Sequence, residues 1–207
     1  MKKFLTIAFS VAIGFSAFAG GNSKTTVGAG FSLPISNMTM ENLSGTPIDF
    51  TTVTPSLNIM VNSIFSSGFA LRGVLDIGIP ISSDIKDNII DYDKSIEFLI
   101  DFGAGYSFIN TDMLSLAAFG IVGFSITRYT AEGTYVDSSF INYNLDIGAD
   151  VVALFNFTHF IGLYASFGVR YKIPIYSAFY LNDTVLHDNF DTSGFECVPA
   201  IGITFNF

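Results

Sequence analysis

Large apolar residues alternate with small or polar residues, one by one, along most of this 207-residue chain. The pattern is plainest in residues 194–207, where alternate positions hold Phe195, Cys197, Pro199, Ile201, Ile203, Phe205 and Phe207. The positions between them hold Gly194, Glu196, Val198, Ala200, Gly202, Thr204 and Asn206. Because successive side chains of a β-strand point to opposite faces, this segment is predicted to be a strand with one strongly apolar face.

Seven further segments divide their residues between two faces in the same way. They lie at residues 24–33, 52–62, 69–79, 95–106, 114–127, 141–151 and 161–172. A two-residue period does not suit an amphipathic helix, whose apolar positions recur every three to four residues. The chain is therefore predicted to be all-β with eight strands, an even number that suits a closed antiparallel barrel.

The connections between these segments are alternately short and long. Short connections lie near residues 62–68, 109–113 and 156–160, and connections of about a dozen residues or more lie near 36–50, 82–94, 129–140 and 176–193. Up-and-down barrels of outer membranes have short periplasmic turns and longer external loops. The order predicts an eight-stranded antiparallel up-and-down transmembrane β-barrel with both termini on the periplasmic side.

A water-soluble β-sandwich or lipocalin-like barrel would also alternate, but its second face would be a solvated surface rich in charged residues. Here the second face is rich in Gly, Ala and Ser, with scattered charges of both signs. Segments of ten or more residues are also long enough to cross a bilayer when tilted. The apolar face is therefore expected to contact lipid, and the second face to fill the lumen.

The first 19 residues have the pattern of a secretory signal peptide. Lys2 and Lys3 precede an apolar run from Phe4 to Phe18, and Ala17 and Ala19 give the small-x-small spacing of a cleavage site. The apolar run is shorter than the roughly 20 residues of a spanning helix. We expect residues 1–19 to be cleaved and residues 20–207 to form a single barrel domain.

Composition excludes several classes of function. The chain has 9 Lys and Arg against 18 Asp and Glu, which leaves no basic surface for nucleic-acid phosphates. A single cysteine, Cys197, excludes an intramolecular disulfide framework and a cysteine-rich metal site. We expect no cofactor and no resident metal.

The C-terminal segment of the chain resembles a known recognition signal. Its alternating residues with a terminal phenylalanine, above all Ile203, Phe205 and Phe207, resemble the signal by which the barrel-assembly machinery recognises bacterial outer-membrane proteins. With the leader and the eight-strand layout, the chain resembles the small OmpA/OmpX-like barrels in architecture, although no motif identifies a subfamily. The resemblance implies a monomer in the bacterial outer membrane, in contact with its lipids.

The predicted inward face carries charges of both signs. They are Arg72, Asp76, Glu97, Asp101, Asp146, Asp150, Arg170, Lys172 and Glu196. Eight strands enclose space only for side chains, which favours an ion-paired plug. The alternative is a polar pathway for small solutes. The excess of carboxylates suggests that some are protonated or bind a cation, because an unpaired buried charge is costly.

The long connections hold a second group of candidates. Acidic residues occur at Asp84, Asp87, Asp91, Asp93, Asp183, Asp188 and Asp191. Their spacing matches no EF-hand pattern, so solvated acidic loops are expected rather than a calcium site. A lipid-modifying enzyme would most plausibly use His187, but no convergent acid or nucleophile is identifiable by spacing. The expected role is a non-enzymatic structural or adhesin-like scaffold that contacts host or surface molecules, with a narrow pore as the alternative.

Overall fold

The computed structural model describes residues 23–41, 47–85, 88–91, 95–132, 137–181, 184–188 and 192–207. The expected signal peptide, residues 1–19, lies outside them. All regular elements in this part of the chain are strands: β1 (Ser23–Ser32), β2 (Ile35–Glu41), β3 (Pro47–Val53), β4 (Ser56–Phe65), β5 (Phe69–Gly78), β6 (Ser82–Ile85), β7 (Asn88–Asp91), β8 (Ile96–Asn110), β9 (Leu114–Glu132), β10 (Asp137–Asn156), β11 (Ile161–Leu181), β12 (Thr184–Asp188) and β13 (Thr192–Asn206).

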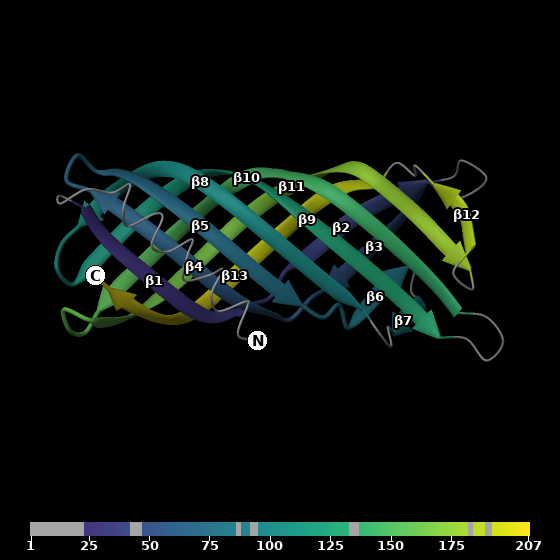
Figure 1. Cartoon of the computed structure of the whole chain (residues 1–207), viewed down its shortest axis with the longest axis horizontal. Coiled ribbons are helices and arrows are strands. Elements are labelled where there is room, and N and C mark those ends of the chain that lie inside the picture. The colour runs from purple at the N-terminus through teal and green to yellow at the C-terminus, as the bar shows by residue number, and fades with distance from the viewer. Residues whose placement is uncertain are drawn as a thin grey trace.

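Eight of these strands close into a ring. Antiparallel pairing runs in the order β1, β4, β5, β8, β9, β10, β11 and β13, and β13 pairs with β1 through contacts such as Gly30 with Gly202. The strands tilt steeply around the long axis of the molecule (Figure 1). The prediction of an eight-stranded antiparallel up-and-down transmembrane barrel is confirmed, and closure gives the backbone of these strands hydrogen-bonding partners without contact with water.

The two ends of the barrel differ. Three short connections lie at the end that also holds the C-terminus, which we call the turn end (Figure 1). In the first of them Gly68 has a positive φ of 86° and its amide donates to the carbonyl of Phe65, a turn geometry that favours glycine. The opposite end, the hairpin end, carries β2, β3, β6, β7 and β12.

Much of the chain predicted as long loops is in fact strand. The pairing of β1 with β13 continues in the same register into β2, across a break at Leu33 and Pro34. The strands β3, β6, β7 and β12 likewise extend the wall beyond the eight predicted segments. Because each extension finds an adjacent strand with which to pair, connection length alone did not indicate irregular structure.

The two faces of the wall divide as the alternation predicts. Large apolar side chains point outward and are exposed, including Phe31, Leu57, Phe102, Ile147, Phe167 and Ile201. The side chains between them are buried in the lumen. Such a continuous exposed apolar band is what a lipid bilayer solvates. Among the described residues no helix is long and apolar enough to cross a membrane.

The lumen was expected to be filled by small, polar and charged side chains, but it also contains large apolar ones. A buried apolar cluster extends from the turn end to the level of the charged residues: Met60, Ile64, Ala70, Val74, Ala117, Phe119, Ile121, Val152, Leu154, Tyr164 and Ala200. The interior of a narrow barrel contacts neither lipid nor bulk water, so it must be filled at close-packed density. Apolar side chains can do this without leaving hydrogen-bonding groups unpaired.

Candidate functional site

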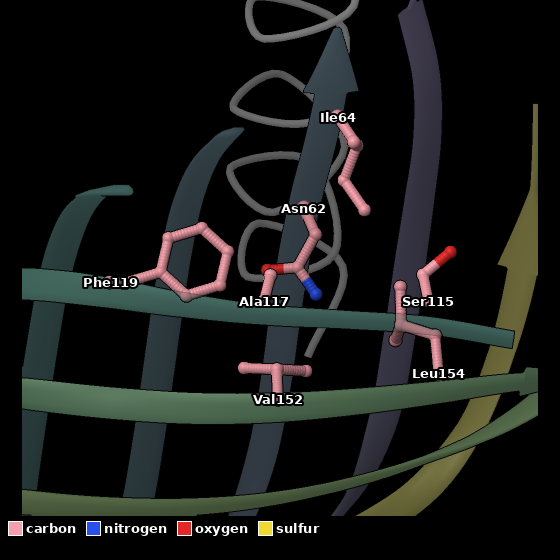
Figure 2. Close-up of a pocket in the computed structure, with 7 residues that line it drawn as sticks. All are labelled: Asn62, Ile64, Ser115, Ala117, Phe119, Val152 and Leu154. Atoms are coloured by element: carbon pink, nitrogen blue, oxygen red, sulfur yellow. The ribbon is translucent and has the colours of Figure 1, made fainter. Parts of the chain in front are cut away.

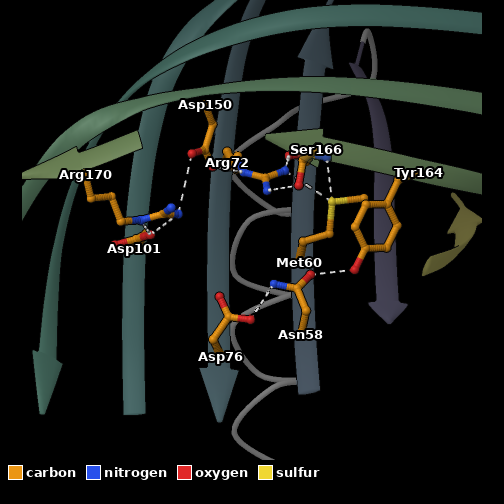
Figure 3. Close-up of polar contacts among 10 residues, drawn as sticks. Asn58, Met60, Arg72, Asp76, Asp101, Asp150, Tyr164, Ser166 and Arg170 are labelled. Carbon is orange, nitrogen blue, oxygen red and sulfur yellow. Dashed lines mark hydrogen bonds and ion pairs between the residues drawn. The ribbon is translucent and has the colours of Figure 1, made fainter. Parts of the chain in front are cut away.

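Two arginines form ion pairs across the middle of the lumen (Figure 3). The Arg72 Nε atom on β5 lies 3.0 Å from Asp150 Oδ2 on β10, and the Arg170 Nε atom on β11 donates to Asp101 Oδ2 on β8 at 2.5 Å. Arg170 Nη2 also lies 3.5 Å from the second oxygen of Asp150. Asp150 therefore links the two guanidinium groups, and all four side chains are at most 2% exposed.

A buried lysine forms a second group of ion pairs. The Lys172 ammonium on β11 lies 2.7 Å from Glu97 on β8 and 2.7 Å from Glu196 on β13. Glu196 also accepts a hydrogen bond from the Ser36 hydroxyl on β2 at 2.6 Å. Through these contacts the Lys172 side chain connects β11, β8 and β13, and the hydrogen bond from β2 holds Glu196 in place.

Asp76 is held by neutral donors instead of a cation. Its Oδ1 atom accepts hydrogen bonds from the Ser32 hydroxyl at 2.6 Å and the Asn58 amide at 2.8 Å. The Tyr164 hydroxyl donates to Asn58 Oδ1 at 2.5 Å from the opposite wall (Figure 3). Asp76 is thus connected across the lumen through Asn58 to Tyr164.

Asp146 differs from the other predicted lumen charges. It forms none of the ion pairs above, and neither of its buried carboxylate oxygens has a partner within hydrogen-bonding distance; the Ser125 hydroxyl and the Lys172 ammonium act on it only from further away. The structure therefore brings eight of the nine predicted charged residues into hydrogen bonds or ion pairs and leaves Asp146 outside them. All nine are buried.

Apolar side chains fill the lumen between these charges and the turn end. A small pocket there is lined by Asn62, Ile64, Ser115, Ala117, Phe119, Val152 and Leu154 (Figure 2). It has no space that would admit a water molecule. The Arg72 guanidinium lies 5.9 Å from the centre of the Phe119 ring, so the charged and apolar layers are in contact.

Toward the hairpin end the charged layer is covered by a second apolar group, comprising Met38, Phe50 and Tyr129. All three side chains are at most 9% exposed. The Phe50 and Tyr129 rings pack edge to face at 6.4 Å, and Tyr129 stacks on Phe140 at 6.1 Å. The ion pairs therefore lie in a compartment with apolar side chains on both sides, where charge interactions are strong and unpaired charges are costly.

The predicted residues of the C-terminal signal lie on the outer face. Ile203, Phe205 and Phe207 are exposed, and Phe207 follows the last residue of β13. Phe205 pairs with both Val27 on β1 and Ile161 on β11, at the seam where the first and last barrel strands meet.

The predicted acidic residues of the long connections are only partly within the described chain. Asp84 lies in β6, Asp91 in β7, and Asp188 and His187 in β12. Asp87, Asp93, Asp183 and Asp191 lie outside the described residues. Within the described ranges, no group of three or more His, Cys, Asp or Glu side chains could hold a metal ion.

Fold and lumen together define a small transmembrane β-barrel of the outer-membrane type with a filled interior. The chain belongs to the family described as a domain of unknown function, DUF2715, whose model matches residues 3–207. A comparison with curated protein sequences finds no match.

Solved structures share the fold at low sequence identity. OprG from Pseudomonas aeruginosa is 10% identical with a TM-score of 0.63, over 90% of this chain and 96% of that one. Neisserial surface protein A is 11% identical with a TM-score of 0.52, over 89% and 97%. Ail of Yersinia pestis, in complex with the heparin analogue sucrose octasulfate, is 12% identical with a TM-score of 0.51, over 90% and 99%. All three are outer-membrane β-barrels.

Proposed function

We propose that this protein is a non-enzymatic scaffold of the bacterial outer membrane that presents its hairpin end to other molecules at the cell surface. The observation that carries the proposal is the filled lumen, in which cross-strand ion pairs lie between two apolar layers. A barrel without an aqueous path offers only its lipid-facing wall and its two ends for interactions. The short turns at one end leave the hairpin end as the larger surface for a partner.

The chemistry of the hairpin end favours a cationic partner. In the sequence, the segments that connect the barrel strands on this side hold eleven carboxylates, of which Asp87, Asp93, Asp183 and Asp191 lie outside the described residues: Glu41, Asp49, Asp84, Asp87, Asp91, Asp93, Glu132, Asp137, Asp183, Asp188 and Asp191. Only Lys86, Lys94 and Arg128 oppose them. An excess of one sign of charge attracts partners of the opposite sign and accelerates their association. We propose that the partners are basic host or surface proteins, and that an anionic saccharide such as the heparin analogue bound by Ail would be disfavoured.

We further propose an orientation in the membrane and a route of assembly for the barrel. The turn end faces the periplasm, residues 1–19 are cleaved after export, and Phe205 with its neighbours on β13 engages the barrel-assembly machinery. The protein is a monomer in contact with outer-membrane lipids. His187 has no catalytic role in this proposal.

The competing candidate is a narrow pore for small cations, which the acidic interior favours. We expect the refolded protein in planar bilayers to show no resolved channel openings, because apolar side chains close the lumen on both sides of the charges. The quadruple variant Phe119→Gly, Leu154→Gly, Phe50→Gly and Tyr129→Gly removes the large side chains of both apolar layers and is expected to open a conducting path. Its openings would show that the assay detects this barrel. Resolved openings in the unchanged protein that Asp101→Asn abolishes would contradict the filled lumen.

A further inference from the structure

The lumen holds more negative than positive side chains. Six carboxylates, at Asp76, Glu97, Asp101, Asp146, Asp150 and Glu196, face three cationic groups, at Arg72, Arg170 and Lys172, and all nine are buried. If every group is ionised, the compartment carries a net charge of −3. An uncompensated charge in a low-dielectric interior is costly, so the excess must be neutralised by something other than these side chains.

The contacts show which carboxylate lacks a neutralising partner. Arg72 and Arg170 pair with Asp101 and Asp150, Lys172 pairs with Glu97 and Glu196, and Asp76 accepts hydrogen bonds from Ser32 and Asn58. Asp146 alone is left with both oxygens buried and unpartnered, although it lies directly across from Lys172 in the β10–β11 register. The ammonium group of Lys172 is engaged by the two glutamates instead.

The unpartnered atoms of this layer are almost all acceptors. Besides the two oxygens of Asp146 they include Asn144 Oδ1, Asp101 Oδ1 and Glu196 Oε1, and the Arg170 Nη1 atom is an unpartnered donor. Asn144 precedes Asp146 by two residues on the same inward face of β10. On the other side of Asp146 lies Gly123 of β9, and the Asp101 carboxylate packs against this glycine. Because unpartnered acceptors outnumber unpartnered donors in this layer, a positive ligand that brings no acceptor of its own would satisfy the Asp146 carboxylate.

We propose that the lumen holds a small monovalent cation, such as Na⁺ or K⁺, bound by the carboxylate of Asp146 and partly hydrated. Hard cations prefer carboxylate, amide carbonyl and water oxygens, and these are the atoms left unpartnered here. No three carboxylates converge as a metal cage within the described chain, so water completes the coordination and a dehydrated divalent ion is not expected. The ion lowers the net charge of the compartment and stabilises the closed barrel without entering the ion pairs of Lys172.

The test measures stability against the identity of the cation. The refolded protein is unfolded by urea in zwitterionic phospholipid vesicles containing NaCl, KCl or N-methyl-D-glucamine chloride at equal ionic strength, with a chelator present. We expect the folding equilibrium constant to be about tenfold larger in NaCl or KCl than with the large organic cation, as mass action predicts at about ten times the dissociation constant. Asp146→Asn is expected to remove this difference.

The matched control is Asp76→Asn, which also removes one buried carboxylate but one that already accepts two hydrogen bonds. It is expected to keep the dependence on the cation. Equal stability of the unchanged protein in all three salts, or a dependence that persists in Asp146→Asn, would overturn the proposal. A third outcome would also overturn it: the stability does not depend on the salt, falls as pH is raised from 5 to 9, and no longer falls in Asp146→Asn. Asp146 would then carry a proton instead of binding a cation. A response to added Ca²⁺ alone would equally reject the monovalent ion.

Discussion

Arg170→Ala is expected to lower the free energy of unfolding by about 3–5 kcal/mol, the range for breaking one side of a buried ion pair. The substitution leaves Asp101 without its cation and removes one of the two guanidinium groups that Asp150 contacts. These carboxylates lie between two apolar layers, so bulk water cannot readily replace the lost partner. Urea unfolding in phospholipid vesicles, followed by the shift in gel migration between folded and heated samples, measures the change.

The control for this experiment is Arg128→Ala on β9, whose side chain is exposed. A surface arginine contributes little, so a change of less than about 1 kcal/mol is expected. The double variant Arg170→Met with Asp101→Leu removes the charges of both partners and should regain most of the stability. Equal effects of Arg170→Ala and Arg128→Ala would show that water reaches the ion pairs.

Gly202→Ala is expected to destabilise the barrel by about 1–3 kcal/mol, the range for inserting atoms into a well-packed interior. Gly202 pairs with Gly30 on one side and Tyr164 on the other. A Cβ atom at Gly202 would overlap the Ala29 carbonyl oxygen and the Tyr164 ring. Because one obstacle is backbone, a rotamer change cannot relieve the overlap. The same urea experiment measures the loss.

Gly120→Ala is the matched control, because it makes the identical change on β9. Its added Cβ would have only the Ala104 carbonyl oxygen nearby, at 3.9 Å, so no loss from overlap is expected. Alanine also has less conformational freedom in the unfolded chain, which favours the folded state. A Gly202→Ala protein as stable as Gly120→Ala would mean that Tyr164 does not pack against the β1 and β13 wall as described.

The eight barrel strands and their inward faces could be predicted from the sequence because the two-residue period acts locally. Asp101, Asp150 and Arg170 were each placed in the lumen in this way. Their pairing could not be predicted, because Arg72 and Asp150 come from strands that are not neighbours in the barrel. Whether two side chains lie at the same height along the barrel axis depends on the tilt and stagger of the strands. The alternation of residues gives no information about either.

Two other features went unpredicted for different reasons. Met60 lies between Asn58 and Asn62 on the same strand face, so its parity was a usable signal for an interior position. Its large apolar side chain did not fit the small, polar and charged filling expected of the lumen. The extension strands, such as β2, continue an existing register across Pro34, and this continuation depends on partners far away in the chain.

The most direct test of the central claim, that the apolar face meets lipid while the lumen is sealed, uses tryptophan fluorescence. The chain contains no Trp, so each single variant reports from one position. Phe102→Trp lies on the outer face of β8, where Phe102 is 46% exposed, and Phe119→Trp lies in the lumen, where Phe119 is 3% exposed. In vesicles of brominated phospholipid we expect strong quenching of the first and little quenching of the second. Quenching of Phe119→Trp with Phe102→Trp unaffected would contradict the arrangement of the two faces.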